Sequence, residues 1–348
     1  MRILAGIIVS MLLFGCLGGG EQPPGDAGNE TNITNQTQKP PVQIIIGGQT
    51  NQTTGGNATE GPPPPPPELN GTQYEYNPDQ LFGVYFIDVG GPGLQGDAIL
   101  IKKGDLDVLV DAGAAEKGGM VVDFLRSKGV DDIEVLISTA ADPRRYGGMG
   151  AVAEAFTIEE FWWNGDASHD ANYSAVVERM TEAAESKDVR VVEDGFTADL
   201  NGMNFTAINP SDAARFDDVN NDAIVLRIVD RDISILLTSN IQTGAQGKLL
   251  NNKLDMIQVN ILQAPYYGVG AGTSNIGVFL IKSKPQAVVI SGSSDESAVN
   301  GGSREPFKRL MEQHGIPYYE NYVAGALRIS SDGKEYSIQA LEEEEEEE

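Results

Sequence analysis

The 348-residue chain contains little cysteine, histidine or basic charge. Its one cysteine, Cys16, excludes a disulfide within the chain and a zinc site built from several cysteines. Its two histidines, His169 and His314, fall in an expected loop and at an expected helix end, where both are interpreted as surface residues. Lysine and arginine number 24 against 51 aspartates and glutamates, which gives a formal net charge of −27. Because this charge repels phosphate backbones, we expect no nucleic-acid partner.

The N-terminus carries an export signal in front of that single cysteine. An apolar run from Ile3 to Phe14 is shorter than the roughly 20 residues that span a bilayer, and is typical of a secretory signal. The segment Leu13-Phe14-Gly15-Cys16 resembles the lipobox of prokaryotic lipoproteins. We therefore expect residues 1–16 to be a lipoprotein-type signal peptide and Cys16 to be lipidated. The lipid anchor then holds the exported protein at the outer face of the cytoplasmic membrane, the cell surface. An ordinary signal peptide with an incidental cysteine is the alternative.

Residues 17–80 have the composition of a disordered linker. They are rich in Gly, Pro, Asn, Thr and Gln, and too poor in apolar residues to fold. The run GPPPPPP at 61–67 predicts a stiff polyproline spacer. Six N-x-T sequons predict a glycoprotein, although the composition alone also produces such triplets; they begin at Asn29, Asn32, Asn35, Asn51, Asn57 and Asn70. The poly-Glu tail, residues 342–348, is expected to be solvated and without chemistry.

Residues 81–341 show the pattern of one folded domain. Short apolar or alternating runs predict strands at 84–89, 98–103, 106–113, 133–139, 223–229, 233–239, 257–262 and 286–291, with two short ones at the end. Helices are expected at 118–129, near 242–251 and 274–283, and at 304–314. Mixed sheets covered by helices give an α/β (α+β) fold.

Several segments of this domain resemble one known family. The segments VYFIDVG…QGDAILI, VLVDAG, VVDFLRSKGVDDIEVLIST…GGM, NNDAIVLRIV…ISILLTSNI and PQAVVISGSS occur in the order and spacing of the metallo-β-lactamase-like domain of the competence-protein ComEC family. The similarity covers about residues 83–340. It implies a four-layer αββα sandwich, in which two mixed sheets lie face to face with helices outside. It also implies a site at one edge, where strand ends converge.

The resemblance further implies that the metal ligands of the family are lost here. Hydrolases of the family carry an H-x-[HD]-x-D-H loop after the strand that ends here at Thr139, and its ligand positions hold Ala140, Asp142, Arg144 and Arg145. A later aspartate position holds Asn240, and a histidine pair is replaced by Tyr266 and Tyr267. Imidazole and carboxylate ligands are what a hydrolytic metal centre needs. We therefore expect no metal, no cofactor and no catalytic residue.

Three acidic residues near this degenerate site are retained, namely Asp88, Asp97 and Asp111. Such residues are expected to cap turns and to accept hydrogen bonds from backbone amides. The family motif DVGQGDA is altered, because DVGGPGLQGDA contains an insert at 91–94. The FWWNG segment at 161–165 supplies both tryptophans, which either close the core or stack on a sugar or a partner surface.

The function favoured by these observations is that of a pseudoenzyme, a membrane-tethered extracytoplasmic module that binds an unknown protein or glycan partner. An alternative is a hydrolase with a non-standard site, in which Asp142, Asp97 and Asp111 hold Mg²⁺ or Ca²⁺, or in which Tyr266 and Tyr267 act as acid and base. A spacer without a ligand is a third interpretation.

The same replacement predicts what fills the site. Carboxylates without a metal repel one another, so we expect Arg144 or Arg145 to turn inward and pair with them. Tyr266 and Tyr267 then fill the volume left by imidazoles and metal. The alternative places both arginines on a solvated loop.

Overall fold

A computed structural model describes residues 81–168, 170–270, 277–296 and 302–341. The expectations for Cys16, the sequons, the linker, His169 and the poly-Glu tail lie outside these residues. Within them, no helix has both the length and the apolar character needed to cross a membrane.

The first sheet has eight strands, and its middle is built from consecutive segments. Two antiparallel pairings join the first three strands, and parallel pairings follow as the chain alternates between strand and helix. The strand order is β15-β14-β1-β2-β3-β4-β5-β6. The strands are β1 (Phe82–Phe86), β2 (Ile99–Lys103), β3 (Leu106–Val110), β4 (Ile133–Ser138), β5 (Ile158–Trp163), β6 (Ala184–Val191), β14 (Leu327–Ser331) and β15 (Tyr336–Ala340). The helices between them are α1 (Gly118–Ser127), α2 (Pro143–Tyr146), α3 (Met149–Ala155) and α4 (Ala171–Ala183).

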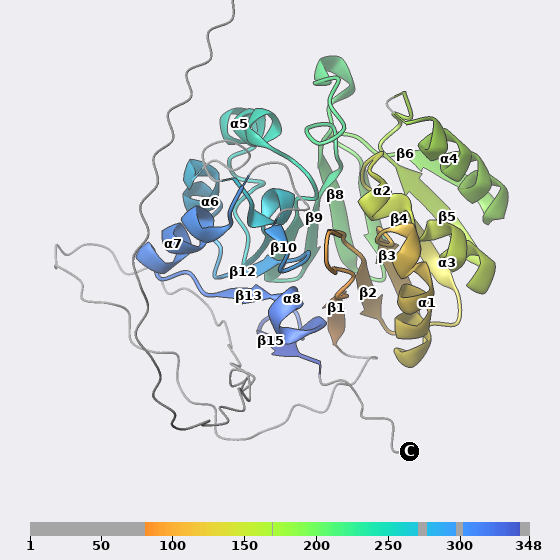
Figure 1. Ribbon diagram of the computed structural model, residues 1–348, viewed down its shortest axis with the longest axis horizontal. Helices are drawn as coiled ribbons and strands as arrows, with labels where there is room; N and C mark the ends of the chain where they lie inside the picture. The colour runs from red at the N-terminus through yellow and green to blue at the C-terminus, as the bar shows by residue number, and fades with distance from the viewer. Residues whose placement is uncertain (1–80, 169, 271–276, 297–301, 342–348) are drawn as a thin grey trace, which may run out of the picture. The chain divides into compact units, whose positions relative to one another are not determined.

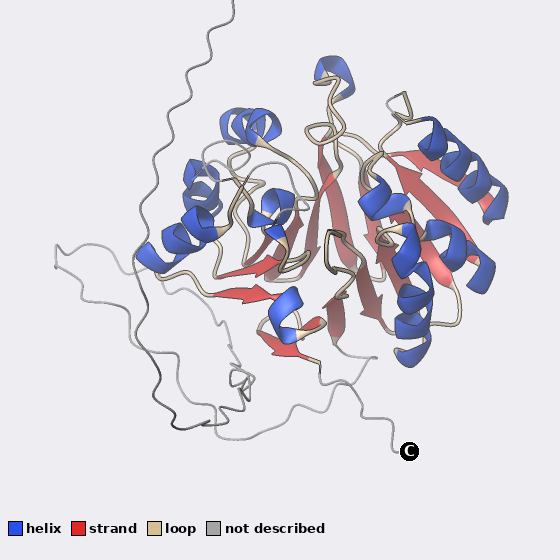
Figure 2. Cartoon of the chain, viewed as in Figure 1, coloured by secondary structure: helices blue, strands red, loops and turns tan. Residues whose placement is uncertain are grey.

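The second sheet has seven strands in the order β13-β12-β11-β10-β9-β8-β7. They are β7 (Thr197–Leu200), β8 (Met203–Asn209), β9 (Val225–Asp230), β10 (Ile233–Leu237), β11 (Ile261–Gln263), β12 (Ala287–Ile290) and β13 (Tyr318–Glu320). The helices of this half are α5 (Thr243–Asn252), α6 (Gly277–Ser283), α7 (Glu305–Gln313) and α8 (Asn321–Ala324). Figures 1 and 2 show the helices outside the two sheets.

Side-chain alternation along the strands creates the layers. In β2, Ile99 and Ile101 belong to the core between the sheets, whereas Leu100 packs beneath the helices of the first sheet. A third cluster contains Leu249 of α5 and Phe307 of α7, and lies beneath the helices of the second sheet. Each fully buried side chain of this kind contributes about 1.5–3 kcal/mol. One apolar cluster thus lies between the two sheets, and one lies between each sheet and its helices. This is the four-layer αββα sandwich expected from the sequence.

Two expectations about elements are corrected. The strand expected at 257–262 is wrong for its first half, because Ile257 and Val259 are buried in a loop and β11 begins only at Ile261. The stretch 143–222, for which no element was expected, contains three helices and four strands. Trp162 belongs to β5 and is completely buried between the sheets, so the core interpretation is confirmed for it.

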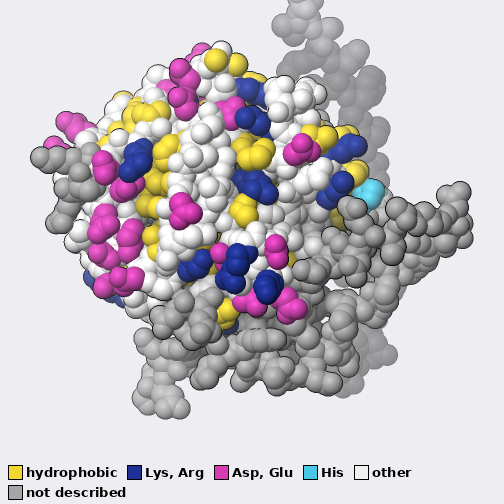
Figure 3. All heavy atoms as spheres, turned by 180° about the vertical axis from the view of Figure 1, so that it is seen from behind, with side chains coloured by type: hydrophobic (Ala, Val, Ile, Leu, Met, Phe, Trp, Pro, Cys, Tyr) yellow, Lys and Arg dark blue, Asp and Glu magenta, His cyan; other side chains and the backbone are white. Residues whose placement is uncertain are grey.

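Charges on the described surface are mixed. Residues 81–341 contain 37 acidic and 22 basic residues, a net charge of −15. Figure 3 shows acidic side chains gathered along one border of one face, with lysine and arginine side chains scattered closer to its centre. On the part of this face that is drawn as described, the basic side chains form no continuous stripe of the kind that binds a phosphate backbone.

Candidate functional site

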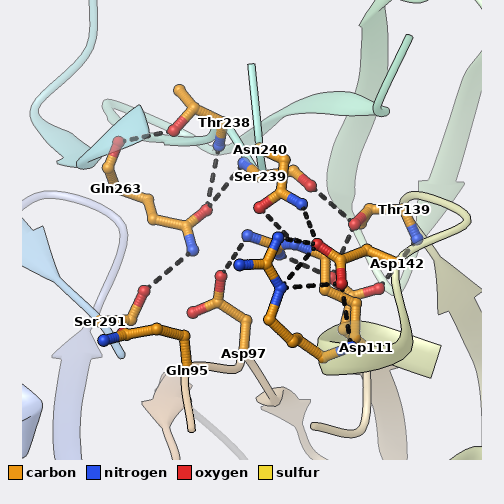
Figure 4. A network of polar contacts seen from close by, with 12 residues as sticks. Gln95, Asp97, Asp111, Thr139, Asp142, Thr238, Ser239, Asn240, Gln263 and Ser291 are labelled. Atoms are coloured by element: carbon orange, nitrogen blue, oxygen red, sulfur yellow. Dashed lines mark hydrogen bonds and ion pairs between the residues drawn. The ribbon is translucent and has the colours of Figure 1, made fainter. Parts of the chain in front are cut away.

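The candidate site is a buried polar cluster at the ends of strands from both sheets. Asp111 follows β3 and Thr139 follows β4, whereas Asn240 and Ser291 follow β10 and β12 of the second sheet. All four side chains are at most 2% exposed. Figure 4 shows that these side chains converge on one region between the two sheets. The edge expected from the sequence therefore exists, and its polar groups lie together.

A guanidinium occupies the middle of this cluster. Arg145 Nη1 lies 2.9 Å from Asp111 Oδ2, and Nη2 lies 2.5 Å from Asp97 Oδ2. Its Nε donates to Asn240 Oδ1 at 2.8 Å. The side chain is 1% exposed, as are both acids that it pairs with. Of the two expected arginines, Arg145 is therefore the one that turns inward.

The neighbouring arginine binds the third carboxylate. Asp142 caps the short helix α2, and its Oδ1 accepts from the backbone N–H of Arg144 at 3.0 Å. The Arg144 side chain also donates to both carboxylate oxygens of Asp142, from Nε to Oδ1 at 2.9 Å and from Nη2 to Oδ2 at 2.6 Å. Asn240 Nδ2 donates to Asp142 Oδ2 at 2.6 Å, which joins this pair to the cluster around Arg145. Although burial opposes ionisation, the hydrogen bonds from Arg144 hold the pKa of Asp142 below its usual value.

Asp97 and Asp111 are held differently. Thr139 donates to Asp111 from its backbone N at 2.8 Å and from its hydroxyl at 2.6 Å. Asp111 thus accepts a hydrogen bond from a backbone amide. The oxygens of Asp97 accept no hydrogen bond of normal geometry from the described part of the chain, and Arg145 is its ion-pair partner. Burial raises the pKa of both acids, and the charge of Arg145 opposes that rise.

Two consecutive tyrosines close the site with a strained backbone. Tyr266 and Tyr267 have φ angles of 45° and 59°, in the left-handed region that bulky residues rarely adopt. Both side chains are at most 3% exposed, and the ring of Tyr267 lies 5.3 Å from the guanidinium carbon of Arg145. The Tyr267 hydroxyl has no hydrogen-bond partner among the described residues, and burial raises its pKa. The ring of Tyr267 thus lies beside the inward arginine.

Several residues of the cluster were not found from the sequence. Gln263 in β11 accepts from the backbone N of Thr238 at 3.0 Å and donates to Ser291 Oγ at 3.3 Å. Arg304, 1% exposed, donates from Nε to the Tyr267 carbonyl at 2.7 Å and from Nη2 to Gln95 Oε1 at 3.2 Å. Polar residues directly after apolar strands were the available signal for Ser291. No local pattern distinguishes Arg304 from a surface arginine.

The other expected site residues lie apart from the cluster or play another part. Ala140 packs in the apolar layer beneath the helices of the second sheet. Asp88 lies on a separate loop, where it accepts from the backbone N of Gly90 at 3.3 Å. His314 is exposed at the end of α7, as expected.

The donor set does not suit a metal ion. Among the residues that the structure describes, no group of three or more His, Cys, Asp or Glu side chains is arranged to hold one. The space between Asp97 and Asp111 is instead filled by the guanidinium of Arg145, which would repel a cation.

Comparison with known proteins identifies the fold and a relative. No protein-family profile matches the chain. Competence protein ComA of Neisseria gonorrhoeae is 25% identical over 238 residues, which are 68% of this chain and 31% of that protein. The chain therefore spans less than a third of this relative.

One solved structure has the same architecture. The metallo-β-lactamase fold protein YhfI from Bacillus subtilis is 10% identical, with a TM-score of 0.50 over 72% of this chain and 100% of that one. Igni18, described as a metallo hydrolase from Ignicoccus hospitalis, is 10% identical with a TM-score of 0.46 over 71% of this chain and 98% of that one. The described part of the chain thus has the metallo-β-lactamase fold, and its sequence is similar to part of a competence protein.

Proposed function

We propose that this domain is a binding module that has lost the metal-dependent hydrolysis of its fold, and that a lipid anchor at Cys16 holds it at the outer face of the cytoplasmic membrane. The observation that carries the proposal is the guanidinium of Arg145, which is buried between Asp97 and Asp111. A guanidinium neutralises carboxylates but cannot lower the pKa of a bound water as a divalent cation does. In this domain the acids of the site are still neutralised by a positive charge, but no group activates water for hydrolysis.

The surroundings of Arg145 support this proposal. The side-chain oxygen of Asn240 accepts a hydrogen bond from Arg145, and its side-chain nitrogen donates one to Asp142. An aspartate at this position, ionised as a metal ligand must be, could not donate that second hydrogen bond. Tyr267 covers the guanidinium with its ring. A metal ion could not share the space between Asp97 and Asp111 with the guanidinium, because the two cations would repel each other, so metal uptake would first require the buried arginine to leave the site.

The test is metal analysis of the full chain, purified without an affinity tag that binds metal. We expect far less than one zinc, manganese or iron per chain. We also expect no turnover of bis(p-nitrophenyl) phosphate or nitrocefin, with or without added zinc or manganese. Stoichiometric metal, together with turnover that a chelator abolishes, would show that the domain is an enzyme.

A further inference from the structure

The outer face of the second sheet is only partly covered by helices. On β10 and β12, Leu236 and Val288 point outward into the apolar cluster beneath the helices, and both are fully buried. On β7 and β8, Thr197, Asp199 and Asn204 also point outward, but these side chains are exposed. Figure 1 shows α5, α6 and α7 grouped beside β10, β12 and β13. Within the described chain, the helices thus leave the outer side of β7, β8 and β9 open.

Strand register arranges the outward side chains of this area in two rows. Residues directly opposite each other in an antiparallel pair project to the same side of the sheet. The first row across β7, β8 and β9 is Thr197, Thr206 and Arg227, and the second is Asp199, Asn204 and Val229. We call these six residues the open face. Its middle is uncharged, and its two charged residues, Arg227 and Asp199, lie at opposite corners.

Arg227 carries a positive charge that no acid of the described chain neutralises. Its Nε is buried and donates no hydrogen bond, and none of the described residues forms an ion pair with its guanidinium. Nε alone of its nitrogens is enclosed in this way, so the Nη groups reach the surface. Burial lowers the pKa of Arg227, with no acid to oppose the effect. A carboxylate brought to this half-buried guanidinium from outside would therefore stabilise it.

The opposite corner of the open face carries the complementary charge. Asp199 is exposed, and its Oδ1 accepts from the backbone N of Gly202 at 2.9 Å, which fixes the side chain at the end of β7. No lysine or arginine in the described ranges forms an ion pair with Asp199. Arg227 lies two strands away and in the other row, and the two do not pair within one chain. The open face thus presents one cation and one anion, each without a counter-charge.

We propose that the open face is the contact surface of a homodimer, in which Arg227 of each copy pairs with Asp199 of the other. A closed two-fold dimer uses the same patch on both copies. A two-fold axis in the plane of contact, running between the two corners at right angles to the line that joins them, places Arg227 opposite Asp199 twice. The uncharged middle then meets itself, with the two sheets about 10 Å apart.

The charge pattern favours a second copy over other partners. A uniformly acidic partner would neutralise Arg227 and repel Asp199, and a basic partner would do the reverse. A second copy satisfies both corners at once. Because residues 81–341 carry a net charge of −15, orientations without these ion pairs would set like charges against each other.

The size of the open face predicts a reversible dimer. Three strands about 4.8 Å apart, with the seven residues of β8 at about 3.4 Å each, span roughly 14 Å by 24 Å. A standard interface covers about 800 Å² on each partner, which is more than this face provides. We therefore expect a dissociation constant of roughly 1–100 μM.

The experiment measures energy transfer between full chains that carry a donor or an acceptor fluorescent protein at the C-terminus. The chains are kept in non-ionic detergent, with micelles in large excess so that two chains do not share one by chance. We expect energy transfer that saturates as the protein concentration rises and that added salt weakens. No transfer at about 100 μM chain would mean that Arg227 has another partner, and the proposal would be wrong.

Charge reversal assigns the association to the open face. Arg227→Glu and Asp199→Arg each reverse one corner, so each variant should associate with itself at least about tenfold more weakly than the parent, because like charges then meet. A mixture of the two variants has opposite charges at both corners again, and its affinity should return to within about threefold of the parent. Damage to the fold cannot produce this recovery, because a misfolded chain would not regain association on mixing.

Two further variants complete the test. Arg309→Glu is the matched control, since Arg309 is 72% exposed on α7, outside the open face, and should leave association unchanged. Asp199→Asn keeps the acceptor for Gly202 and removes only the charge, so it should also weaken association. If the charge-reversed variants associate with themselves as the parent does, or if the mixed pair stays apart while circular dichroism shows both folded, the proposal is wrong. Metal analysis tests the proposed function separately.

Discussion

At the scale of single residues, the stability of the site depends on the buried positive charge of Arg145. Arg145 and its partners Asp97 and Asp111 are each 1% exposed. Removing one member of such a group leaves the others buried and unpaired, which costs more than the intact group contributes. The two adjacent arginines should therefore differ sharply in their effect on stability.

Arg145→Ala is expected to lower the free energy of unfolding by about 3–5 kcal/mol, because it leaves two buried carboxylates without a cation. Arg144→Ala should cost only about 1–2 kcal/mol, since Arg144 is 27% exposed and Asp142 keeps its bond from Asn240. Urea unfolding followed by circular dichroism measures both.

Arg309→Ala is the control for this pair, because Arg309 is 72% exposed on α7 and should stay within about 0.5 kcal/mol of the parent. An Arg145→Ala variant as stable as this control would show that the buried ion pairs do not hold the site together.

A second residue-scale prediction concerns pH. Glu134 accepts from the backbone N of Asp107 at 2.7 Å, and burial raises its pKa to about 7 from an ordinary 4.5. The folded protein therefore binds this proton more tightly than the unfolded chain, so the resulting stability is complete below pH 4.5 and is lost as pH rises through 7.

Glu134→Gln keeps an acceptor oxygen and removes the titration. The variant should be more stable than the parent by about 1 kcal/mol at pH 8, with the difference vanishing near pH 4, because solvent screens part of the shift. Thermal unfolding across this pH range, with the exposed Glu178→Gln as control, measures the difference. A constant difference at every pH would mean that Glu134 does not titrate in this way.

At the scale of elements, a close backbone contact positions the site. Gly148 precedes α3, and a Cβ there would lie 2.1 Å from the carbonyl oxygen of Ala112, two residues after the end of β3. Gly148→Ala should therefore push α2 and α3 away from the sheet and cost about 1–3 kcal/mol.

Gly247→Ala is the matched substitution, because Gly247 lies inside α5 with nothing within 4 Å of a Cβ. It should stabilise the protein by about 0.5–1 kcal/mol through helix propensity. Thermal unfolding measures both variants against the parent protein. If both substitutions raise the melting temperature, or both lower it, this account is wrong.

The elements also show why part of the fold was predictable. The strand near 98–103 begins with a continuous apolar run because both of its faces are buried, with Ile99 and Ile101 facing one layer and Leu100 another. Helix α4 has only Tyr173 and Met180 fully buried, so its apolar periodicity is weak. Strand β7 lies at the edge of its sheet and has no fully buried side chain, which removes the usual signal.

For the site, the resemblance to known motifs supplied the positions, and charge balance supplied the pairing. The sequence could not show which of Arg144 and Arg145 turns inward, because the two are neighbours on a four-residue helix and pair with different residues. That choice is made by groups distant in sequence, above all Asn240. The left-handed backbone at Tyr266 and Tyr267 was equally hidden, since tyrosine carries no preference for it.

At the scale of the whole molecule, the proposed anchor makes a prediction about location. The parent protein should fractionate with membranes and take up labelled fatty acid, whereas Cys16→Ser should do neither after its signal is processed. Membrane fractionation with Ser10→Ala as control measures this. A Cys16→Ser protein that stays in the membrane fraction would disprove lipidation as the tether.

The position of β1 in the sheet determines when that strand can become fully paired as the chain is synthesised. This strand pairs on one side with β2, which follows it directly, and on the other with β14, near the end of the domain. A ribosome releases β1 long before β14, and until then β1 has an unpaired edge. The first sheet therefore stays incomplete until β14 has been synthesised. A chain truncated before β14 presents that edge to other molecules.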